Sequence, residues 1–156
     1  MGLPGYGVAR KDLSTGEILL PLTEEPDSGT PGSNEILPSS QVYSLAVNPD
    51  TGNLYIGTGN GALTWNGNTA TDLSRGGSWN LQPSQHFGFV FDGSTAYSAT
   101  NIGVCEYTQT AIQECVNAQD GMPNWGVYAI GMNSTTIFGG TTNGVGPVSY
   151  THLTLP

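Results

Sequence analysis

Short apolar runs alternate with polar, glycine-rich turns along most of the chain, and the pattern repeats every 40 to 45 residues. Each unit opens with a proline, and an apolar run with the character of a β-strand begins four residues later. These prolines, spaced 45 and 40 residues apart, are Pro38, Pro83 and Pro123. Each unit also contains a Thr-x-x-Gly sequence, whose threonines, spaced 42 and 41 residues apart, are Thr58, Thr100 and Thr141. The near-constant spacing indicates that one structural unit is repeated.

The turns within each unit predict antiparallel strands. A first turn, rich in Asn, Asp, Ser, Thr and Gly, lies at residues 48–53, 92–95 and 133–136, and most of these residue types favour hairpin connections. The Thr-x-x-Gly turn follows, and then a third strand and a weaker fourth one, at 69–73 and 111–116. Four antiparallel strands in 40 to 45 residues are typical of a β-propeller blade. We therefore predict an all-β fold, a β-propeller fragment of about 2–3 four-stranded antiparallel blades.

The repeat also divides the chain into segments. Residues 1–22 are expected to supply the last strands of a preceding blade, and residues 23–36 to form an acidic insertion rich in Pro and Gly. Two full blades follow at 37–81 and 82–121, and a third blade begins at 122–147. Because a propeller ring needs roughly 4–8 blades, we expect the remaining blades to belong to the same protein, of which this sequence is a fragment.

The last nine residues, 148–156, do not continue the repeat. Their sequence, VSYTHLTLP, matches the translation of a transposon-based sequencing adapter in one reading frame. We expect residues 148–156 to be a translated adapter, with a natural carboxyl terminus as the alternative. They are therefore left out of the fold prediction.

The glycine-rich stretch NLYIGTGNGALTW at residues 53–65 raises the alternative of a phosphate-binding loop. Such a loop ends a strand and opens a helix whose backbone amides face the phosphate. Here Gly61 is followed by Ala-Leu-Thr-Trp and Asn-Gly, a β-prone stretch that is too short for a helix. The same turn recurs in the other two units, so we interpret it as a hairpin turn and not as a nucleotide site.

The stretch LYIGTGNGAL at residues 54–63 resembles the repeat of the two-component-regulator type propeller family. Tyr55 stands where that family commonly has tryptophan, and the other two units share the Thr, the Gly and the apolar alternation. The resemblance covers residues 37 to about 147 and implies a propeller with a sensory role. The Asp-box of sialidase blades is absent, because Leu63-Thr-Trp65 lacks the preceding Ser and Asp.

Charge and hydropathy exclude several classes of partner. The chain has 12 acidic residues and three basic ones, Arg10, Lys11 and Arg75, so its formal net charge at pH 7 is −9. A chain of this charge repels nucleic acid and anionic membranes. No apolar run reaches the roughly 18–20 residues of a membrane span, and the first residues lack the apolar core of a signal peptide. We expect neither nucleic-acid binding nor membrane insertion in this segment.

Cys105 and Cys115 lie on neighbouring strands of one predicted hairpin. If each pair of facing residues has numbers that sum to 220, the two cysteines are directly opposite, with Cα atoms about 4.5–5.5 Å apart. The same register places Glu106 opposite Glu114, a mildly unfavourable pair of like charges. We predict a disulfide, with two reduced buried thiols as the alternative. A disulfide favours an oxidising, extracytoplasmic compartment (periplasm, cell surface or outside the cell), with the signal peptide upstream of this segment.

Catalytic chemistry finds little support in the sequence. A Gly-x-Ser-x-Gly elbow is absent, and with His152 in the excluded tail the one remaining histidine cannot form a metal cluster. The Asn/Asp-rich turn at 48–53 has the oxygen donors of a calcium site, but such a turn also forms without a metal. We predict no catalytic residue, no metal and no cofactor.

The segments that lead into the first strands share one rim of a propeller with the Thr-x-x-Gly turns, above the central channel. Aromatic and amide side chains on this rim suit stacking on, and hydrogen bonding to, a sugar or a peptide. The alternative is that the tryptophans wedge between blades and the amides cap turns. The candidate rim residues are Asn60, Trp79, Gln85, His86, Asn101, Asn124, Trp125 and Asn143.

These features together predict a non-catalytic sensory or binding propeller outside the cytoplasm. Its expected partner is a small polar ligand (a sugar or a peptide) or a protein. Two alternatives stay open. The chain could belong to a propeller enzyme of the glycoside hydrolase or lyase type, with its catalytic residues on further blades, or to a structural interaction module of the cell surface.

Overall fold

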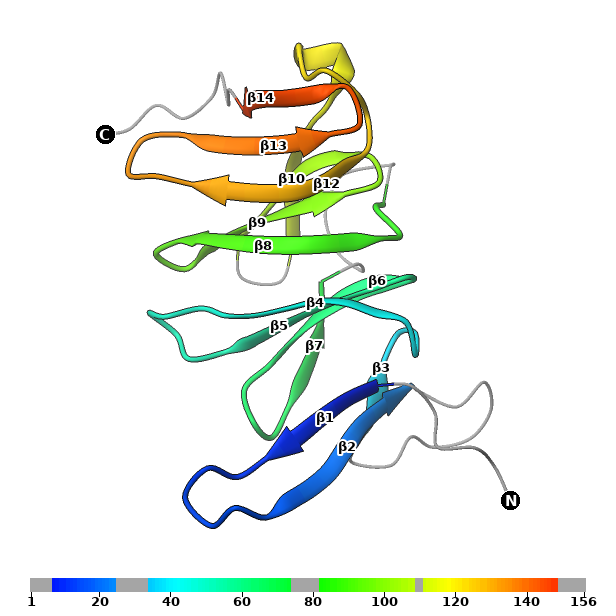
Figure 1. Ribbon diagram of the computed structural model, residues 1–156, viewed down its shortest axis with the longest axis vertical. Helices are drawn as coiled ribbons and strands as arrows, with labels where there is room; N and C mark the ends of the chain where they lie inside the picture. Colours follow the sequence, from blue (N-terminus) through cyan, green and yellow to red (C-terminus); the bar gives the residue numbers. More distant parts are fainter. Residues whose placement is uncertain (1–6, 25–33, 74–81, 109–110, 149–156) are drawn as a thin grey trace.

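The computed structural model describes residues 7–24, 34–73, 82–108 and 111–148, which form four small sheets stacked one above another (Figure 1). The first sheet contains β1 (Gly7–Lys11), β2 (Ile18–Glu24) and β3 (Glu35–Leu37). The second contains β4 (Val42–Val47), β5 (Leu54–Thr58), β6 (Gly61–Trp65) and β7 (Ala70–Asp72). The third contains β8 (His86–Asp92), β9 (Thr95–Thr100), β10 (Gly103–Thr108) and β11 (Ala111–Val116). The fourth contains β12 (Val127–Met132), β13 (Ile137–Thr141) and β14 (Gly144–Val148).

The second, third and fourth sheets, called blades 1, 2 and 3 below, are antiparallel meanders in which each strand pairs with the next one in the sequence. Their first strands, β4, β8 and β12, lie side by side (Figure 1). This arrangement confirms the predicted all-β fold and the partial, propeller-like architecture. A 3-10 turn, η1 (Ala118–Asp120), connects blades 2 and 3. Across the described ranges, no helix has the length and apolar character needed to cross a membrane.

The first sheet differs from the blades in its topology. β1 pairs with β2 in antiparallel fashion, whereas the short β3 pairs with β2 in parallel. The segment 23–36, expected as an insertion, therefore has its two ends inside the sheet, at the end of β2 and the start of β3. Leu22 and Leu37 are fully buried in a cluster with Ile56 of blade 1, so this sheet packs on one face of that blade.

A threonine side chain closes the second turn of each blade. In blade 1 the Thr58 hydroxyl donates to the Gly61 carbonyl over 2.7 Å, and the Asn60 amide donates to the same hydroxyl over 3.2 Å. Gly61 has a φ of 117°, a conformation that strains any residue with a side chain. The same bonds form in the other blades, at Thr100 with Gly103 and at Thr141 with Gly144. The glycine-rich stretch is thus a hairpin turn, as predicted.

Successive side chains along each strand point to opposite faces of the blade, and both faces can therefore pack against a neighbouring sheet. In β5 the fully buried Ile56 faces the first sheet, whereas its neighbour Tyr55 faces blade 2, where its ring centroid lies 4.9 Å from that of Phe91. Gly57 allows a close approach of the two blades, because a Cβ atom there would collide with the His86 carbonyl of blade 2. The core is therefore divided into layers between successive sheets.

Candidate functional site

Each first strand contains a β-bulge at its second residue. The pairing of β4 with β5 jumps from Val42 to Ser44, which leaves Tyr43 without a partner residue in the ladder. Phe87 in β8 and Tyr128 in β12 are skipped in the same way. A bulge re-aims the skipped side chain and increases the local twist of the strand. Three blades thus carry one aromatic side chain each at the same end of their first strands.

Tyr43, Phe87 and Tyr128 form a continuous aromatic row across the three blades. The ring centroids of Tyr43 and Phe87 lie 5.3 Å apart and those of Phe87 and Tyr128 lie 5.0 Å apart, with interplanar angles of 37° and 42°. Both tyrosines are exposed, and Phe87 between them is half-buried. The row offers ring faces and phenolic hydroxyls on one surface. Such surfaces suit the apolar faces of sugars and the side chains of peptides.

The aromatic row lies beside the predicted rim. The residue before each of its members pairs with the threonine of the second turn, in the pairs Val42 with Thr58, His86 with Thr100 and Val127 with Thr141. The Thr-x-x-Gly turns therefore lie at the same end of the blades as the aromatic row.

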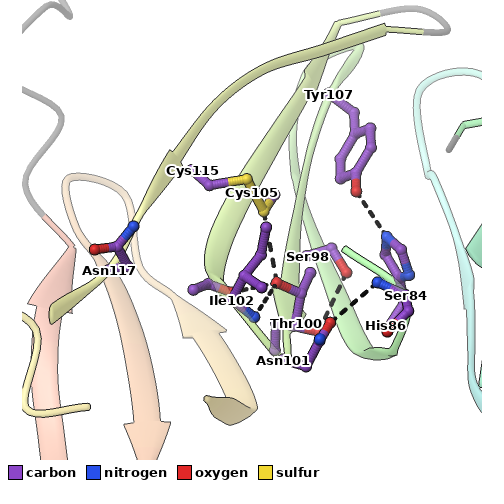
Figure 2. Close-up of a disulfide and its surroundings, with 12 residues drawn as sticks. Ser84, His86, Ser98, Thr100, Asn101, Ile102, Cys105, Tyr107, Cys115 and Asn117 are labelled. Atoms are coloured by element: carbon purple, nitrogen blue, oxygen red, sulfur yellow. Dashed lines mark hydrogen bonds between the residues drawn. A yellow bond between two sulfur atoms is a disulfide. The ribbon is translucent and has the colours of Figure 1, made fainter. Parts of the chain in front are cut away.

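In blade 2, the side chain of Asn101 holds the segment that leads into β8. Its Oδ1 atom accepts hydrogen bonds from the backbone amides of Ser84 and Gln85, both over 3.1 Å, and Figure 2 shows the bond to Ser84. The carbonyl of Ser84 in turn accepts from the Gly61 amide of blade 1 over 2.6 Å. Asn101 and Gln85 are thus brought together, and the Asn101 carbonyl oxygen serves to cap the backbone.

In blade 3, three of the predicted residues cluster. Asn124 donates from Nδ2 to the Thr142 hydroxyl over 2.9 Å, and its Oδ1 atom accepts from the Trp125 amide over 2.7 Å. Asn143 donates from Nδ2 to the Pro123 carbonyl over 3.4 Å. Both amide side chains thus bond to backbone groups of blade 3, at Trp125 and Pro123, while the Trp125 side chain remains exposed. Asn60 is exposed in the turn of blade 1, and Trp79 lies outside the described residues.

His86 does not offer its ring on the rim, which corrects the expectation. Its side chain is 0% exposed, and its Nε2 atom lies 2.6 Å from the Tyr107 hydroxyl (Figure 2). His86 is the first residue of β8, and its ring points into blade 2, where it stacks near the ring of Phe89. Burial lowers the pKa of His86 to about 3 and raises the pKa of Tyr107. Both groups are therefore neutral near pH 7, and neither can exchange a proton with a ligand on the rim.

The sulfurs of Cys105 and Cys115 form a disulfide between β10 and β11 (Figure 2). The two residues face each other as the predicted register required, with a Cα separation of 4.0 Å, shorter than expected, and both side chains are buried. Glu106 and Glu114 are the next facing pair. Burial, and to a smaller extent the charge of Glu114, raise the pKa of Glu106.

Among the described residues, no group of three or more His, Cys, Asp or Glu side chains is placed to hold a metal ion. In the turn at 48–53, Asn48 Oδ1 accepts from the amides of Asp50 and Thr51 over 2.8 and 3.2 Å. Asn48 Nδ2 donates to the Gly93 carbonyl of blade 2 over 3.0 Å. This side chain thus shapes the turn and links two blades.

No family model matches the chain, and no curated protein sequence matches it. Among solved structures, it is similar to PorZ, described as an essential bacterial surface component of the type-IX secretion system of the human oral bacterium Porphyromonas gingivalis. The TM-score is 0.57 at 16% sequence identity, over 68% of this chain. The likeness is one of fold. The match spans only 17% of that PorZ chain.

The aromatic row was missed by the sequence analysis, although a signal for it was present. Tyr43, Phe87 and Tyr128 are spaced 44 and 41 residues apart, close to the period of the threonines. All three residues are aromatic, whereas the residues that follow them, Ser44, Gly88 and Ala129, differ from unit to unit. Regular alternation gave no reason to expect that a bulge would turn all three toward one another.

Proposed function

We propose that this protein is a non-catalytic, extracytoplasmic binding module, and that the aromatic row is its ligand-binding surface. The observation that carries the proposal is the bulge that recurs in three successive first strands and aligns Tyr43, Phe87 and Tyr128. The exposed Trp125 and the amide of Asn143 belong to the neighbouring turns of blade 3. A sugar or a short peptide that stacks on the rings and bonds to these polar groups is the ligand we propose.

The location is supported by the disulfide and by the structural neighbour. Disulfides persist mainly in oxidising compartments such as the periplasm and the cell surface. PorZ, which shares the fold, is described as a surface component of a secretion system. We therefore propose that the chain works outside the cytoplasm as an interaction module. The resemblance of residues 54–63 to two-component-regulator type blades adds a sensory role to the proposal.

The proposal is tested by screening the oxidised 156-residue chain on glycan and peptide arrays and measuring the affinity of each hit by calorimetry. Tyr128→Ala is expected to weaken binding about 10- to 100-fold, because it removes an exposed aromatic anchor. Leu13→Ala is the matched control, since Leu13 is exposed on the β1–β2 hairpin and is not part of the row.

Three results would contradict this proposal. The first is a chain that binds nothing on either array, and the second is an equal loss of affinity in both variants. The third is turnover of the bound sugar or peptide, which would favour the propeller-enzyme alternative.

A further inference from the structure

We propose that Asn66 is a self-modification site of this protein, where the backbone amide of Gly67 attacks the side-chain amide and converts the asparagine to aspartate and isoaspartate. Both residues lie in the turn between β6 and β7, at residues 66–69, and all of this turn is exposed. The turn follows the last residue of β6, whereas the Thr-x-x-Gly turn of the same blade precedes its first residues. Modification at Asn66 is therefore independent of ligand binding by the aromatic row.

The reaction needs only the chain itself and water. The backbone nitrogen of Gly67 gives up its proton and forms a bond to Cγ of Asn66, which closes a succinimide ring. The bond from Cγ to Nδ2 breaks, and the side-chain nitrogen leaves with that proton as ammonia. Water then opens the succinimide at either carbonyl, which yields aspartate or isoaspartate. Glycine favours the ring closure because no Cβ atom stands beside the attacking nitrogen.

Hydrogen bonds within the turn prepare Asn66 for this attack. Its Oδ1 atom accepts from the backbone amides of Asn68 over 3.0 Å and of Thr69 over 2.7 Å. These two amides polarise the side-chain carbonyl and stabilise the negative charge that Oδ1 carries once the nitrogen has attacked, as the donors of an oxyanion hole do. The Gly67 amide itself has no hydrogen-bond partner within the described residues. A Cβ atom on Gly67 would meet nothing within 4 Å, so the backbone there has room to rotate.

The same turn occurs at two other asparagines that lack the glycine. Asn48 and Asn133 each accept two backbone amides on Oδ1, from the second and third residues after them. Asn48 precedes Pro49, which has no N–H group and cannot attack. Asn133 precedes Ser134, whose side chain crowds the attacking nitrogen. Of these three turns, the one at Asn66 combines the polarised carbonyl with an unhindered nitrogen.

Two further Asn-Gly pairs, at 60–61 and 143–144, lie in Thr-x-x-Gly turns, where the fold protects them. The Gly61 amide donates to the Ser84 carbonyl over 2.6 Å, so the nitrogen that would attack is already held. Nδ2 of Asn143, the group that would leave, donates to a carbonyl of blade 3 over 3.4 Å. Within the part of the chain that the structure describes, no backbone amide donates to Oδ1 of Asn143 or of Asn60. The fold thus selects one of three pairs with the same sequence.

The product alters the closure of this turn. The Asn66 amide donates to the Thr69 carbonyl over 3.2 Å, and the flanking residues Trp65 and Ala70 face each other in the ladder. Isoaspartate adds a carbon atom to the main chain between these paired residues, and either product adds a carboxylate that is charged at pH 7. We therefore expect the isoaspartate form to unfold at a lower urea concentration than the unmodified chain.

Incubation of the oxidised 156-residue chain in mildly alkaline buffer tests the selection. Peptide mass spectrometry follows each Asn-Gly pair, and an isoaspartyl carboxyl methyltransferase detects isoaspartate. In the folded chain Asn66 should react about 10-fold or more faster than Asn60 and Asn143, because the oxyanion donors act on Asn66 alone. In the urea-unfolded chain the three rates should be similar. Equal rates in the folded chain, or a slower rate at Asn66, would overturn the proposal.

Two variants test the role of the turn. Ser134→Gly gives Asn133 a glycine neighbour in the same hydrogen-bonded turn, at an exposed position, so Asn133 should then react about as fast as Asn66. Asn66→Ser removes the reacting amide but keeps an oxygen that can accept backbone amides, and it should abolish the main isoaspartate signal. Circular dichroism checks the fold of both variants. An Asn133 that stays as slow as in the wild type, or an isoaspartate signal that persists in Asn66→Ser, would contradict the proposal.

Discussion

At the scale of single residues, His86 determines how the fold responds to acid. Its imidazole is buried in blade 2 against the Tyr107 hydroxyl, and Nδ1 has no hydrogen-bond partner within the described residues. Burial lowers the pKa to about 3, while the unfolded chain retains the usual value near 6.5. Between these two pH values the imidazole is protonated in the unfolded chain but neutral in the folded chain. Because of His86, the free energy of unfolding is therefore highest above about pH 6.5 and decreases as the pH falls toward 3.

This shift predicts a measurable loss of stability in mild acid. The free energy of unfolding should fall by about 2 kcal/mol between pH 7 and pH 5 because of His86 alone. Urea unfolding at the two pH values measures the change, and His86→Gln, which cannot titrate, serves as the comparison. The variant should be less stable at pH 7 but should lose much less stability on acidification. An equal loss in both proteins would assign the effect to other groups.

At the scale of elements, the β10–β11 hairpin illustrates what a strand pattern can and cannot predict. The register that pairs Cys105 with Cys115 and Glu106 with Glu114 follows from strand alternation and is confirmed. One residue further the ladder shifts, and Tyr107 pairs with Ile112. A bulge of this kind depends on sheet twist and packing, which the local sequence does not encode. The same reason explains why the bulges that build the aromatic row escaped prediction.

The disulfide in this hairpin predicts a second stability effect. It closes a loop of sequence separation 10, for which the chain-entropy model gives about 2–3 kcal/mol. Cys105→Ala/Cys115→Ala should lower the free energy of unfolding by at least this amount in urea, and Cys115→Ala alone should cost nearly as much. Two thiols that react with an alkylating agent in the native, unreduced chain would contradict the bond itself.

At the scale of the whole molecule, most of the architecture could be predicted from the spacing of a few residues. The threonines and glycines of the second turn recur because each turn needs the same hydroxyl bonds and the same positive φ, as at Thr58 and Gly61. The burial of His86 could not be predicted, because its partner Tyr107 lies 21 residues away on another strand. Nor could the capping role of Asn101 be distinguished from a ligand contact, since an amide suits both.

Both the propeller-like fold and the aromatic row depend on successive blades stacking face to face with their first strands adjacent. Nuclear Overhauser spectroscopy of the oxidised chain, with labelled Tyr and Phe, tests this directly. We expect contacts from the Tyr55 ring to the Phe91 ring, 4.9 Å apart, and from the Phe87 ring to both Tyr43 and Tyr128. Assigned spectra in which these rings show no contacts between blades would contradict the stacking, and with it the aromatic row.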